Sequence, residues 1–488
     1  MFYKKIDMES IGLQIDNSYT ELPKELFTKM ESANVPRPSL ELFNDSFAES
    51  LGLDFSEISD SAKAEIFCGN IRLPHSIPIA QAYGGHQFGR FTFLGDGRAL
   101  LLAEHITPEG KRVDIQLKGS GPTPYSRGGD GLAALGPMLR EYLISEAMAA
   151  LNIPTTRSLA VVLTNQKIQR QVELDGAVLT RIAKSHIRVG TFQYALAQGG
   201  VETLKALADY AIDRHFQDIK EGNRYLGLLN EVIKAQAALI AQWQLVGFIH
   251  GVMNTDNMAI SGETMDYGPC AFLDVYDPKI FFSSIDYSGR YAYVNQPAIA
   301  AWNLARFAET LLPILDKDQF LAQAIAQDAV ETFLPLFKNE WVGGMRKKLG
   351  LFGEETGDES LINELLNIMQ KQHMDYHLTF VNLTTNVDAL EKIPEFSDWL
   401  LKYRTRRLKQ SESVDQSIAL MKSVNPAIVP RNHLVEEALN LAVEYHDLSK
   451  FSYLLELLKN PFQYTSEQLQ SNQPASSSSV PYKTYCGT

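Results

Sequence analysis

A polar stretch from His250 to Gly268 (HGVMNTDNMAISGETMDYG) restricts what this chain can fold into more than any other segment. It follows a helical pattern with a single apolar stripe, which predicts a rigid core helix that delivers the stretch to a fixed place. The stripe consists of Leu229, Val232, Ile233, Leu239, Ile240 and Trp243.

The polar groups of this stretch stand in two places. Asp256 and Asn257 are neighbours, and Asp266 opens an Asp-Tyr-Gly turn a few residues later. A nucleotide-bound Mg²⁺ takes a few protein oxygens and leaves its other positions to phosphate and water. Asn257 and Asp266 meet that need from two neighbouring loops, although either motif alone is more often an ordinary turn.

Protein kinases use the same order of residues, with an Asn at the end of the catalytic loop and an Asp at the start of Asp-Phe-Gly. In that frame His250 is the loop histidine. A kinase has its catalytic Asp two residues later, where this chain has Val252, which cannot accept a proton. The presence of Val252 at this position speaks against ordinary transfer of a γ-phosphate. The nearest carboxylate that could replace the kinase Asp is that of Asp256.

A predicted strand from Arg112 to Lys118 alternates apolar and polar residues and ends at a lysine. The segment GSGPTPYSRGGDG follows at residues 119–131 and is suited to closing over a polyanion. Lys118 therefore has the placement of the kinase lysine that binds nucleotide phosphates. The alternative is a solvated lysine on an exposed strand face.

A predicted helix over residues 137–151 offers two partners for Lys118, namely Glu141 and Glu146. They lie about 140° apart on a helical wheel, so only one can face the lysine. Helical phase favours Glu146, which shares the apolar stripe with Leu139 and Leu143.

Further strands are predicted for LAVVLTN, KIQRQVEL and GAVLTRIA. Arg181 and Arg188 follow seven residues apart, which places them on one face if the segment is helical. The strands FTFL and RALLLAE predict a hairpin with Gly95-Asp96-Gly97 at its tip. The alternative is a glycine loop that approaches phosphate, with Arg98 supplying charge.

Composition narrows the class of protein. The chain has 488 residues and a formal net charge of −13, which argues against nucleic acid or an anionic membrane as the main partner. No apolar run approaches the roughly 20 residues that cross a bilayer. Three cysteines without a CxxC pair, and an N-terminus without a signal-peptide pattern, predict a cytoplasmic protein.

Motifs along nearly the whole chain resemble those of the selenoprotein O family, the YdiU-type proteins of bacteria, which are pseudokinases that act as protein adenylyltransferases. They are AYGGHQFG (82–89), LGDGRA (94–99), QLKGSGPTPYSRGGDG (116–131), LREYLISEAM (139–148), HGVMNTDNM (250–258), DYGP (266–269) and NPAIVPRN (425–432). The resemblance implies an α+β, protein-kinase-like fold with two lobes. The expected parts are an N-terminal wrapping extension (1–70), a β-rich N-lobe (71–190), a helical C-lobe with the catalytic loop (191–410) and a C-terminal extension with a flexible tail (411–488).

The resemblance also implies roles for single residues, with ATP bound in a flipped orientation so that AMP is transferred. Asp256 is then the base, Asn257 and Asp266 bind Mg²⁺ or Mn²⁺, and Glu141 pairs with Lys118, against the argument from helical phase. The residues implied around the nucleotide are Gly95, Gly97, Arg98, Lys118, Asp130, Gly131, Arg181, Arg188 and Asp266.

The function expected from this resemblance is transfer of AMP from ATP, or of UMP from UTP, to Ser, Thr or Tyr hydroxyls of proteins, including the chain itself. Two alternatives stay open: a kinase that transfers the γ-phosphate, and a non-catalytic nucleotide-binding scaffold.

Eukaryotic members of the family carry selenocysteine three places from the end, where this chain has Cys486. Some bacterial members are thought to tie this tail to a cysteine in the activation segment. Phe282 stands at the expected position here, and Cys270 is the only thiol nearby. The sequence therefore does not predict an internal disulfide latch.

Overall fold

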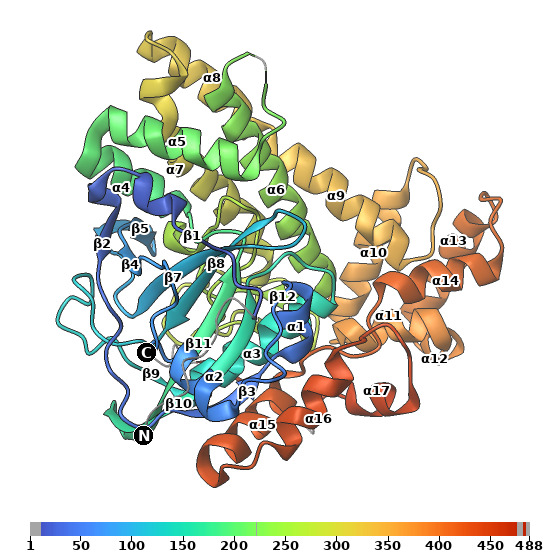
Figure 1. Cartoon of the computed structure of the whole chain (residues 1–488). Coiled ribbons are helices and arrows are strands. Elements are labelled where there is room, and N and C mark those ends of the chain that lie inside the picture. The colour runs from blue at the N-terminus through green and yellow to red at the C-terminus, as the bar shows by residue number, and fades with distance from the viewer. Residues whose placement is uncertain (1–10, 221, 476–481, 485–488) are drawn as a thin grey trace.

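The computed structural model describes residues 11–220, 222–475 and 482–484. An antiparallel sheet dominates the first part of the chain, and helices make up most of the second (Figure 1). This arrangement confirms the predicted α+β fold with a β-rich N-lobe and a helical C-lobe. The division of the chain at residues 70, 190 and 410 stays a prediction.

The central sheet has the strand order β2-β4-β7-β8-β11-β10-β3, with β1 paired to β7 and β9 to β11. All of its pairings are antiparallel, as short connections between β7 and β8 and between β10 and β11 favour. The strands before residue 70 join the same sheet. The bounds are β1 (Ile15–Asp16), β2 (Phe27–Lys29), β3 (Ser39–Phe43), β4 (Ile79–Gln81), β7 (Ala99–Ile106), β8 (Arg112–Lys118), β9 (Ala133–Ala134), β10 (Arg157–Gln169) and β11 (Glu173–Ala183).

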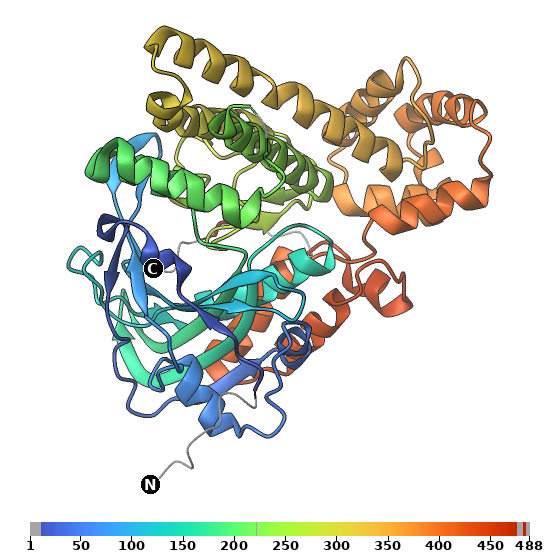
Figure 2. The ribbon, with the colours of Figure 1, turned by 45° about the horizontal axis from the view of Figure 1, so that its top comes forward.

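Strand β8 has the predicted bounds, and both of its faces are buried. Ile115 and Leu117 belong to the core beneath α1 (Asp45–Ser50) and α2 (Asp60–Phe67). The opposite face carries Lys118, which is 5% exposed. Figure 2 shows the sheet between α1 and α2 on one side and the helical half on the other. The alternative of a solvated lysine on an exposed strand face is therefore wrong.

The predicted hairpin across Gly95-Asp96-Gly97 is also wrong. Strand β6 (Arg90–Phe93) pairs with β5 (Gly84–Gln87) in a separate two-stranded sheet, whereas β7 pairs with β8. The turn is held against β4 instead, because the Asp96 N–H donates to the Gln81 carbonyl (2.9 Å) and the Gln81 N–H donates to the Asp96 carboxylate (3.1 Å).

The three strands predicted between residues 159 and 183 are two, since β10 and β11 form one long hairpin. Arg181 lies on β11, and Arg188 is the N-cap residue of α4 (Val189–Tyr194). The prediction that both arginines share a helical face is therefore wrong. The apolar residues around Arg181 pair across β8 and β10 and keep this segment extended.

The apolar stripe before His250 lies in the main core, which confirms the predicted core helix, α6 (Arg224–Val246). The Asn223 side chain caps its start, and Gly247 ends it in the left-handed conformation. The other helices of this half are α5 (Gly200–His215), α7 (Gln296–Leu315), α8 (Gln319–Glu331), α9 (Phe333–Lys348), α10 (Asp358–Lys371), α11 (Tyr376–Thr385), α12 (Asp388–Glu391), α13 (Pro394–Arg407) and α14 (Val414–Val424).

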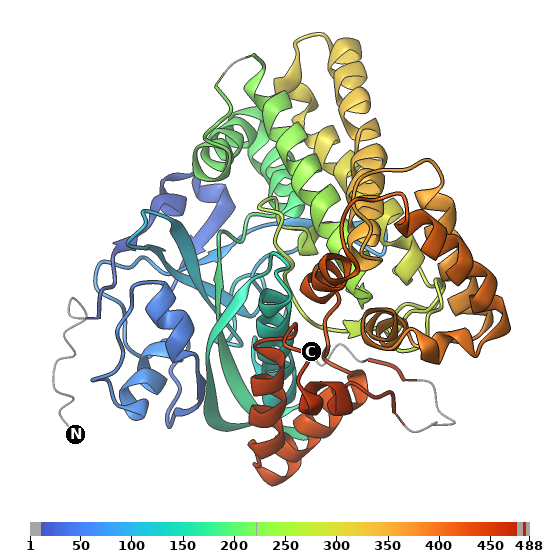
Figure 3. The ribbon, with the colours of Figure 1, turned by 90° about the vertical axis from the view of Figure 1, so that its right-hand side faces the viewer.

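The C-terminal segment packs on α3 (Leu135–Ala150) through α15 (Asn432–Tyr445) and α16 (Ser449–Leu458), as Figure 3 shows, and ends its described helices with α17 (Ser466–Ser471).

The NPAIVPRN motif anchors this segment to the rest of the chain. The fully buried Arg431 donates to Asp274 (3.0 Å) and Asp375 (2.8 Å). Asn432 exchanges two hydrogen bonds with the backbone of Phe272 in β13 (Ala271–Phe272), the strand that pairs with β12 (Phe248–Ile249). The motif therefore holds the chain just after the Asp-Tyr-Gly turn.

In the described part of the chain, every helix is too short or too polar to span a membrane.

Candidate active site

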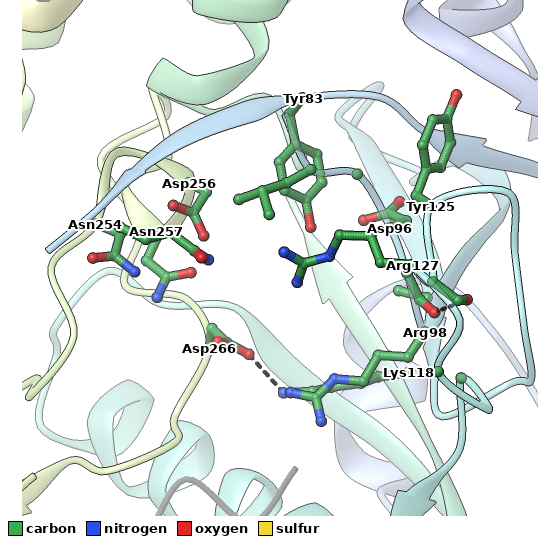
Figure 4. Close-up of a pocket in the computed structure, with 18 of the residues that line it drawn as sticks. Tyr83, Asp96, Arg98, Lys118, Tyr125, Arg127, Asn254, Asp256, Asn257 and Asp266 are labelled. Atoms are coloured by element: carbon green, nitrogen blue, oxygen red, sulfur yellow. Dashed lines mark hydrogen bonds and ion pairs between the residues drawn. The ribbon is translucent and has the colours of Figure 1, made fainter. Parts of the chain in front are cut away.

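One cavity of about 630 Å³ lies between the sheet, the loop of residues 119–131 and the polar loops of residues 250–268 (Figure 4). Glu141 contacts Lys118 from outside the lining. The predicted base Asp256 and all residues predicted to contact nucleotide or metal line the cavity, namely Gly95, Gly97, Arg98, Lys118, Asp130, Gly131, Arg181, Arg188, Asn257 and Asp266.

Four charged side chains from distant segments meet at one wall of this cavity. The Lys118 ammonium donates to Glu141 of α3 (2.7 Å) and to Asp266 (2.6 Å). Arg181 contacts the same two carboxylates, at 2.7 Å in the case of Asp266. Burial opposes ionisation, but the two cations hold the pKa of Glu141 below its usual value and the pKa of Asp266 well below it. Both carboxylates are therefore charged at neutral pH.

The argument from helical phase, which favoured Glu146, is wrong. Glu146 accepts two hydrogen bonds from Arg157 (2.8 and 2.5 Å) and one from Asn44 (2.8 Å). Helix α3 is packed by the sheet on one side and by α15 and α16 on another. Its apolar stripe therefore does not identify the side that faces Lys118.

Asp256 lies in a single helical turn, η4 (Thr255–Asn257), pressed between two backbone segments. A Cβ on Gly85 would lie 2.1 Å from the Asp256 Oδ1, and a Cβ on Gly190 would lie 3.4 Å from the Asp256 Cα. Asp256 is 8% exposed, and its Oδ1 has no hydrogen-bond partner within the described chain. Burial raises the pKa of this carboxyl to about 6. A carboxylate with such a pKa suits a general base near neutral pH.

His250 joins the two polar loops from inside the core. Its ring stacks on Trp243 and its Nε2 lies 2.9 Å from the carbonyl of Met265, next to Asp266. Burial lowers the pKa of His250, so the ring is neutral and donates this hydrogen bond. Val252 lines the cavity at the position of the kinase Asp.

The donor set for a hard cation consists of one amide and one carboxylate. The Asn257 Nδ2 donates to the carbonyl of Val252 (3.0 Å), which fixes its side chain. Both ion pairs of Asp266 use Oδ1, so Oδ2 has no ion-pair partner in the described chain. The described residues contain no cluster of three or more His, Cys, Asp or Glu suited to a metal. Two hard oxygen donors fit Mg²⁺ that keeps phosphate and water as its other ligands.

The loop of residues 119–131 folds over the turn at residues 95–97. The Ser126 hydroxyl donates to the carbonyl of Gly97. A Cβ on Gly95 would lie 2.4 Å from the Tyr125 ring, and Gly95 has a φ of 149°, so this position requires glycine. Backbone of the glycine turn thereby borders the cavity.

The cations of the cavity differ in their partners. Arg170 binds Asp130 (2.7 and 3.0 Å) at the rim, so the carboxylate of this predicted nucleotide contact is already occupied. Arg98 and Arg127, by contrast, form no ion pair within the residues that the structure describes. Two unpaired guanidinium groups in one polar cavity can bind the oxygens of a polyanion.

Arg188 reaches the cavity from the start of α4. Its guanidinium lies 4.0 Å from the centroid of the Tyr83 ring and 3.7 Å from the Asp96 carboxylate. Asp96 also accepts from Gln116 (3.3 Å), so this arginine is held in place by aromatic and acidic partners from the sheet.

Sequence reasoning missed several lining residues, namely Tyr83, Asp96, Tyr125, Arg127 and Asn254. Arg127 and Tyr125 stand within the glycine-rich segment, and their charge and ring were the available signal. Tyr83 and Asn254 carried no such signal. The Asn254 side chain joins two other segments to the catalytic loop, since its Oδ1 accepts hydrogen bonds from the Phe88 N–H (3.1 Å) and from the Tyr291 hydroxyl (2.7 Å).

The cysteine prediction is only partly covered by the structure, because Cys486 lies outside the described residues. Burial raises the pKa of the Cys270 thiol to about 12. The Phe282 carbonyl accepts a hydrogen bond from the Thr484 N–H (2.8 Å), and its ring lies 5.7 Å from that of Tyr482. The described end of the tail therefore contacts the segment after Asp266 without a covalent bond.

The chain is similar to known proteins over almost its whole length. The family model described as protein adenylyltransferase SelO matches residues 9–459. The protein nucleotidyltransferase YdiU of Alkaliphilus metalliredigens is 56% identical over 481 residues, which are 98% of this chain and 98% of the relative. The proteins of the same description from Clostridium botulinum (strain 657) and Bacillus cereus (strain AH187) are 58% and 56% identical over 98% of this chain and 98% and 99% of the relatives.

Among solved structures, ROP2 from Toxoplasma gondii, described as a virulence factor with a protein-kinase fold and no enzymatic activity, covers 68% of this chain and 88% of its own. The identity is 12% and the TM-score 0.23, so this likeness carries no argument.

Proposed function

The chain belongs to the SelO family of protein adenylyltransferases, and from this premise we propose that it transfers AMP from ATP to Ser, Thr or Tyr hydroxyls of proteins, itself included. It is a protein nucleotidyltransferase, as its relatives are. The finer assignments concern the nucleotide, the acceptor and the role of each side chain.

The observation that carries the proposal is the position of Asp256. This desolvated carboxylate, whose Oδ1 has no hydrogen-bond partner among the described residues, lines the same cavity as the donor pair Asn257 and Asp266. Arg98 and Arg127, which form no ion pair in that part of the chain, line it too. In the proposed step the acceptor oxygen forms a bond to the α-phosphorus, and Asp256 takes the hydroxyl proton. The bond from the α-phosphorus to the bridging oxygen breaks, and pyrophosphate leaves. Positioning and electrostatics supply most of the rate in such a step.

The cations of the cavity suit the leaving group. Arg98 and Arg127 have no carboxylate to displace within the described chain, so they can bind phosphate oxygens directly. Lys118 and Arg181 are shared between Glu141 and Asp266, which holds them at the wall. Bound Mg²⁺ or Mn²⁺ would neutralise phosphate charge, and Asn257 and Asp266 are the residues that would hold it.

The mouth of the cavity supports a protein acceptor. Phe88 and Ile285 line the cavity and are 36% and 41% exposed, and Tyr287, two residues after Ile285 in sequence, is 92% exposed. An apolar rim around a charged cavity suits the side chains that flank an acceptor hydroxyl in a polypeptide.

Reduced, buried Cys68 and Cys270 support a cytoplasmic location.

Labelled ATP tests the proposal. The full chain is incubated with an unfolded acceptor protein and Mg²⁺, using ATP labelled at either the α- or the γ-phosphate, and mass spectrometry identifies the modified residues. We expect the α-label on hydroxyl side chains. Transfer of the γ-label would establish a kinase instead, and no transfer of either label would favour a nucleotide-binding scaffold. A parallel incubation with UTP and Mn²⁺ compares the two nucleotides.

A further inference from the structure

A second cavity, of about 430 Å³, shares no lining residue with the active site. Its lining residues come from the ends of α6 and α9, the turn after α3 and the end of α14. Its volume is large enough for a small organic ligand. The nucleotide and the acceptor proposed for the first cavity would not occupy this second one.

The walls of this cavity combine seven apolar side chains and two glycines with nine polar or charged side chains. Gly343 of α9 opens onto it, because a Cβ at this position would meet only the Arg346 side chain, 3.9 Å away. Its neighbour Gly344 packs tightly, since a Cβ there would lie 2.1 Å from the Leu245 side chain. The apolar lining consists of Leu151, Ile153, Leu245, Val246, Val424, Pro426 and Phe462.

Lys348, the last residue of α9, also lines this cavity and is 3% exposed. Its ammonium lies 4.0 Å from the centroid of the Phe380 ring and 5.5 Å from that of Tyr376, and neither of these rings lines the cavity. It has no carboxylate partner among residues 11–220, 222–475 and 482–484. Burial lowers the pKa of this amine to about 7.

The other charges of the lining are more exposed. Arg346 pairs with Glu354, and Lys347 and Glu340 lie at the surface. Lys348 is therefore the buried cation of the cavity, and an ion that is removed from water without a counterion is costly. A ligand carboxylate would supply the missing partner, while the apolar side chains of the lining would cover the rest of the ligand.

We propose that this cavity binds a small organic anion with an apolar body and one carboxylate, and that the carboxylate pairs with the Lys348 ammonium. The competing explanation is a structural lysine that only packs on Phe380. The two explanations differ in what removal of the charge does to binding.

Isothermal titration of the full chain near pH 7 tests the proposal with a series of monocarboxylates, namely butyrate, octanoate, dodecanoate and benzoate, with 1-octanol as the neutral counterpart. We expect at least one carboxylate to bind, and to bind more tightly than 1-octanol. Lys348→Met should weaken that binding by roughly tenfold or more. Lys347→Met removes an exposed charge one residue away and is the matched control, with binding unchanged.

A second variant probes the cavity without touching the lysine. Gly343→Phe places a ring into the open space, so it should weaken binding by a similar factor while circular dichroism shows an intact fold. The proposal is overturned if no carboxylate of the series binds, if Lys348→Met binds like the wild type, or if ATP displaces the carboxylate, which would locate it in the first cavity.

Discussion

Two lysines of this protein are buried to nearly the same degree but in opposite surroundings. Lys118 is 5% exposed and has two carboxylates within 2.7 Å, whereas Lys348 is 3% exposed, lies against an aromatic ring and is a lining residue of the second cavity. Burial lowers the pKa of Lys348 to about 7.

The comparison shows two ways to keep a cation away from water. In the first cavity the chain itself supplies the counterions, Glu141 and Asp266, from segments far apart in sequence. In the second cavity the described chain supplies no carboxylate, and the cost of the buried charge is reduced by the aromatic ring and by loss of the proton. The first arrangement is preorganised, while the second is suited to an external anion.

The largest expected effect separates chemistry in the first cavity from binding in the second. Asp256→Asn keeps the size of the side chain but removes the proton acceptor, so AMP transfer should fall by roughly 10²–10⁴. Nucleotide affinity and the carboxylate binding of the second cavity should stay close to wild type. Single-turnover transfer and titration calorimetry measure these quantities, and a wild-type transfer rate would show that Asp256 is not the base.

The next prediction compares the two lysines directly. Lys118→Met leaves Glu141 and Asp266 short of a cation, so the free energy of unfolding should fall on the order of 3 kcal/mol. Nucleotide affinity should fall by about ten- to a hundredfold with it. Lys348→Met removes a buried charge that has no carboxylate partner in the described chain and keeps contact with Phe380, so the free energy of unfolding should stay equal or rise. Urea unfolding measures both, and a loss of stability in both variants would contradict the contrast.

The pH dependence of stability sharpens the same contrast. The pKa of Lys348 is about 7 in the fold and about 10.4 in an unfolded chain, so between these values the unfolded state binds the extra proton. Wild-type stability should therefore rise with pH relative to Lys348→Met across this window. The advantage of the variant is largest near and below pH 7 and fades toward pH 10.

The groups around Lys348 do not obscure this comparison. Burial holds the pKa of His377 well below its usual value and raises that of Tyr376, so both stay neutral across the window. Melting curves of the two proteins from about pH 6 to pH 9.5 measure the effect. A gap in melting temperature that does not change with pH would mean that Lys348 keeps its proton throughout.

The smallest expected effect lies at the mouth of the first cavity. Tyr287→Ala should lower AMP transfer to a protein acceptor by less than about fivefold, because a single exposed side chain at the edge of an interface contributes under about 1 kcal/mol. ATP affinity should not change. Tyr445→Ala is the matched control, since Tyr445 is also exposed but is the last residue of α15 in the C-terminal segment. Equal rates for the two variants would remove Tyr287 from the acceptor surface.

The fold class and several elements could be predicted because their signals are local. Strand β8 has the predicted bounds, since the alternation of Val113, Ile115 and Leu117 is a period-two pattern. The helix before His250 was equally clear from its apolar stripe. Two glycines around Asp96, by contrast, predicted a hairpin, although β6 and β7 pair with other strands. A turn signal describes the turn and not the partners of the strands beside it.

The candidate site likewise contains residues that could be predicted from the sequence and contacts that could not. Asp256, Asn257 and Asp266 stand close together in sequence, and Lys118 ends a strand before a glycine-rich segment, so residue type and spacing were enough to single them out. Whether Glu141 or Glu146 meets Lys118 depends on the direction of α3, which is packed on more than one side. The burial of the Asp256 Oδ1 and of the Lys348 ammonium depends on segments tens to hundreds of residues away. Only the tertiary structure could decide these points, because desolvation and ion pairing arise from distant segments that fold together.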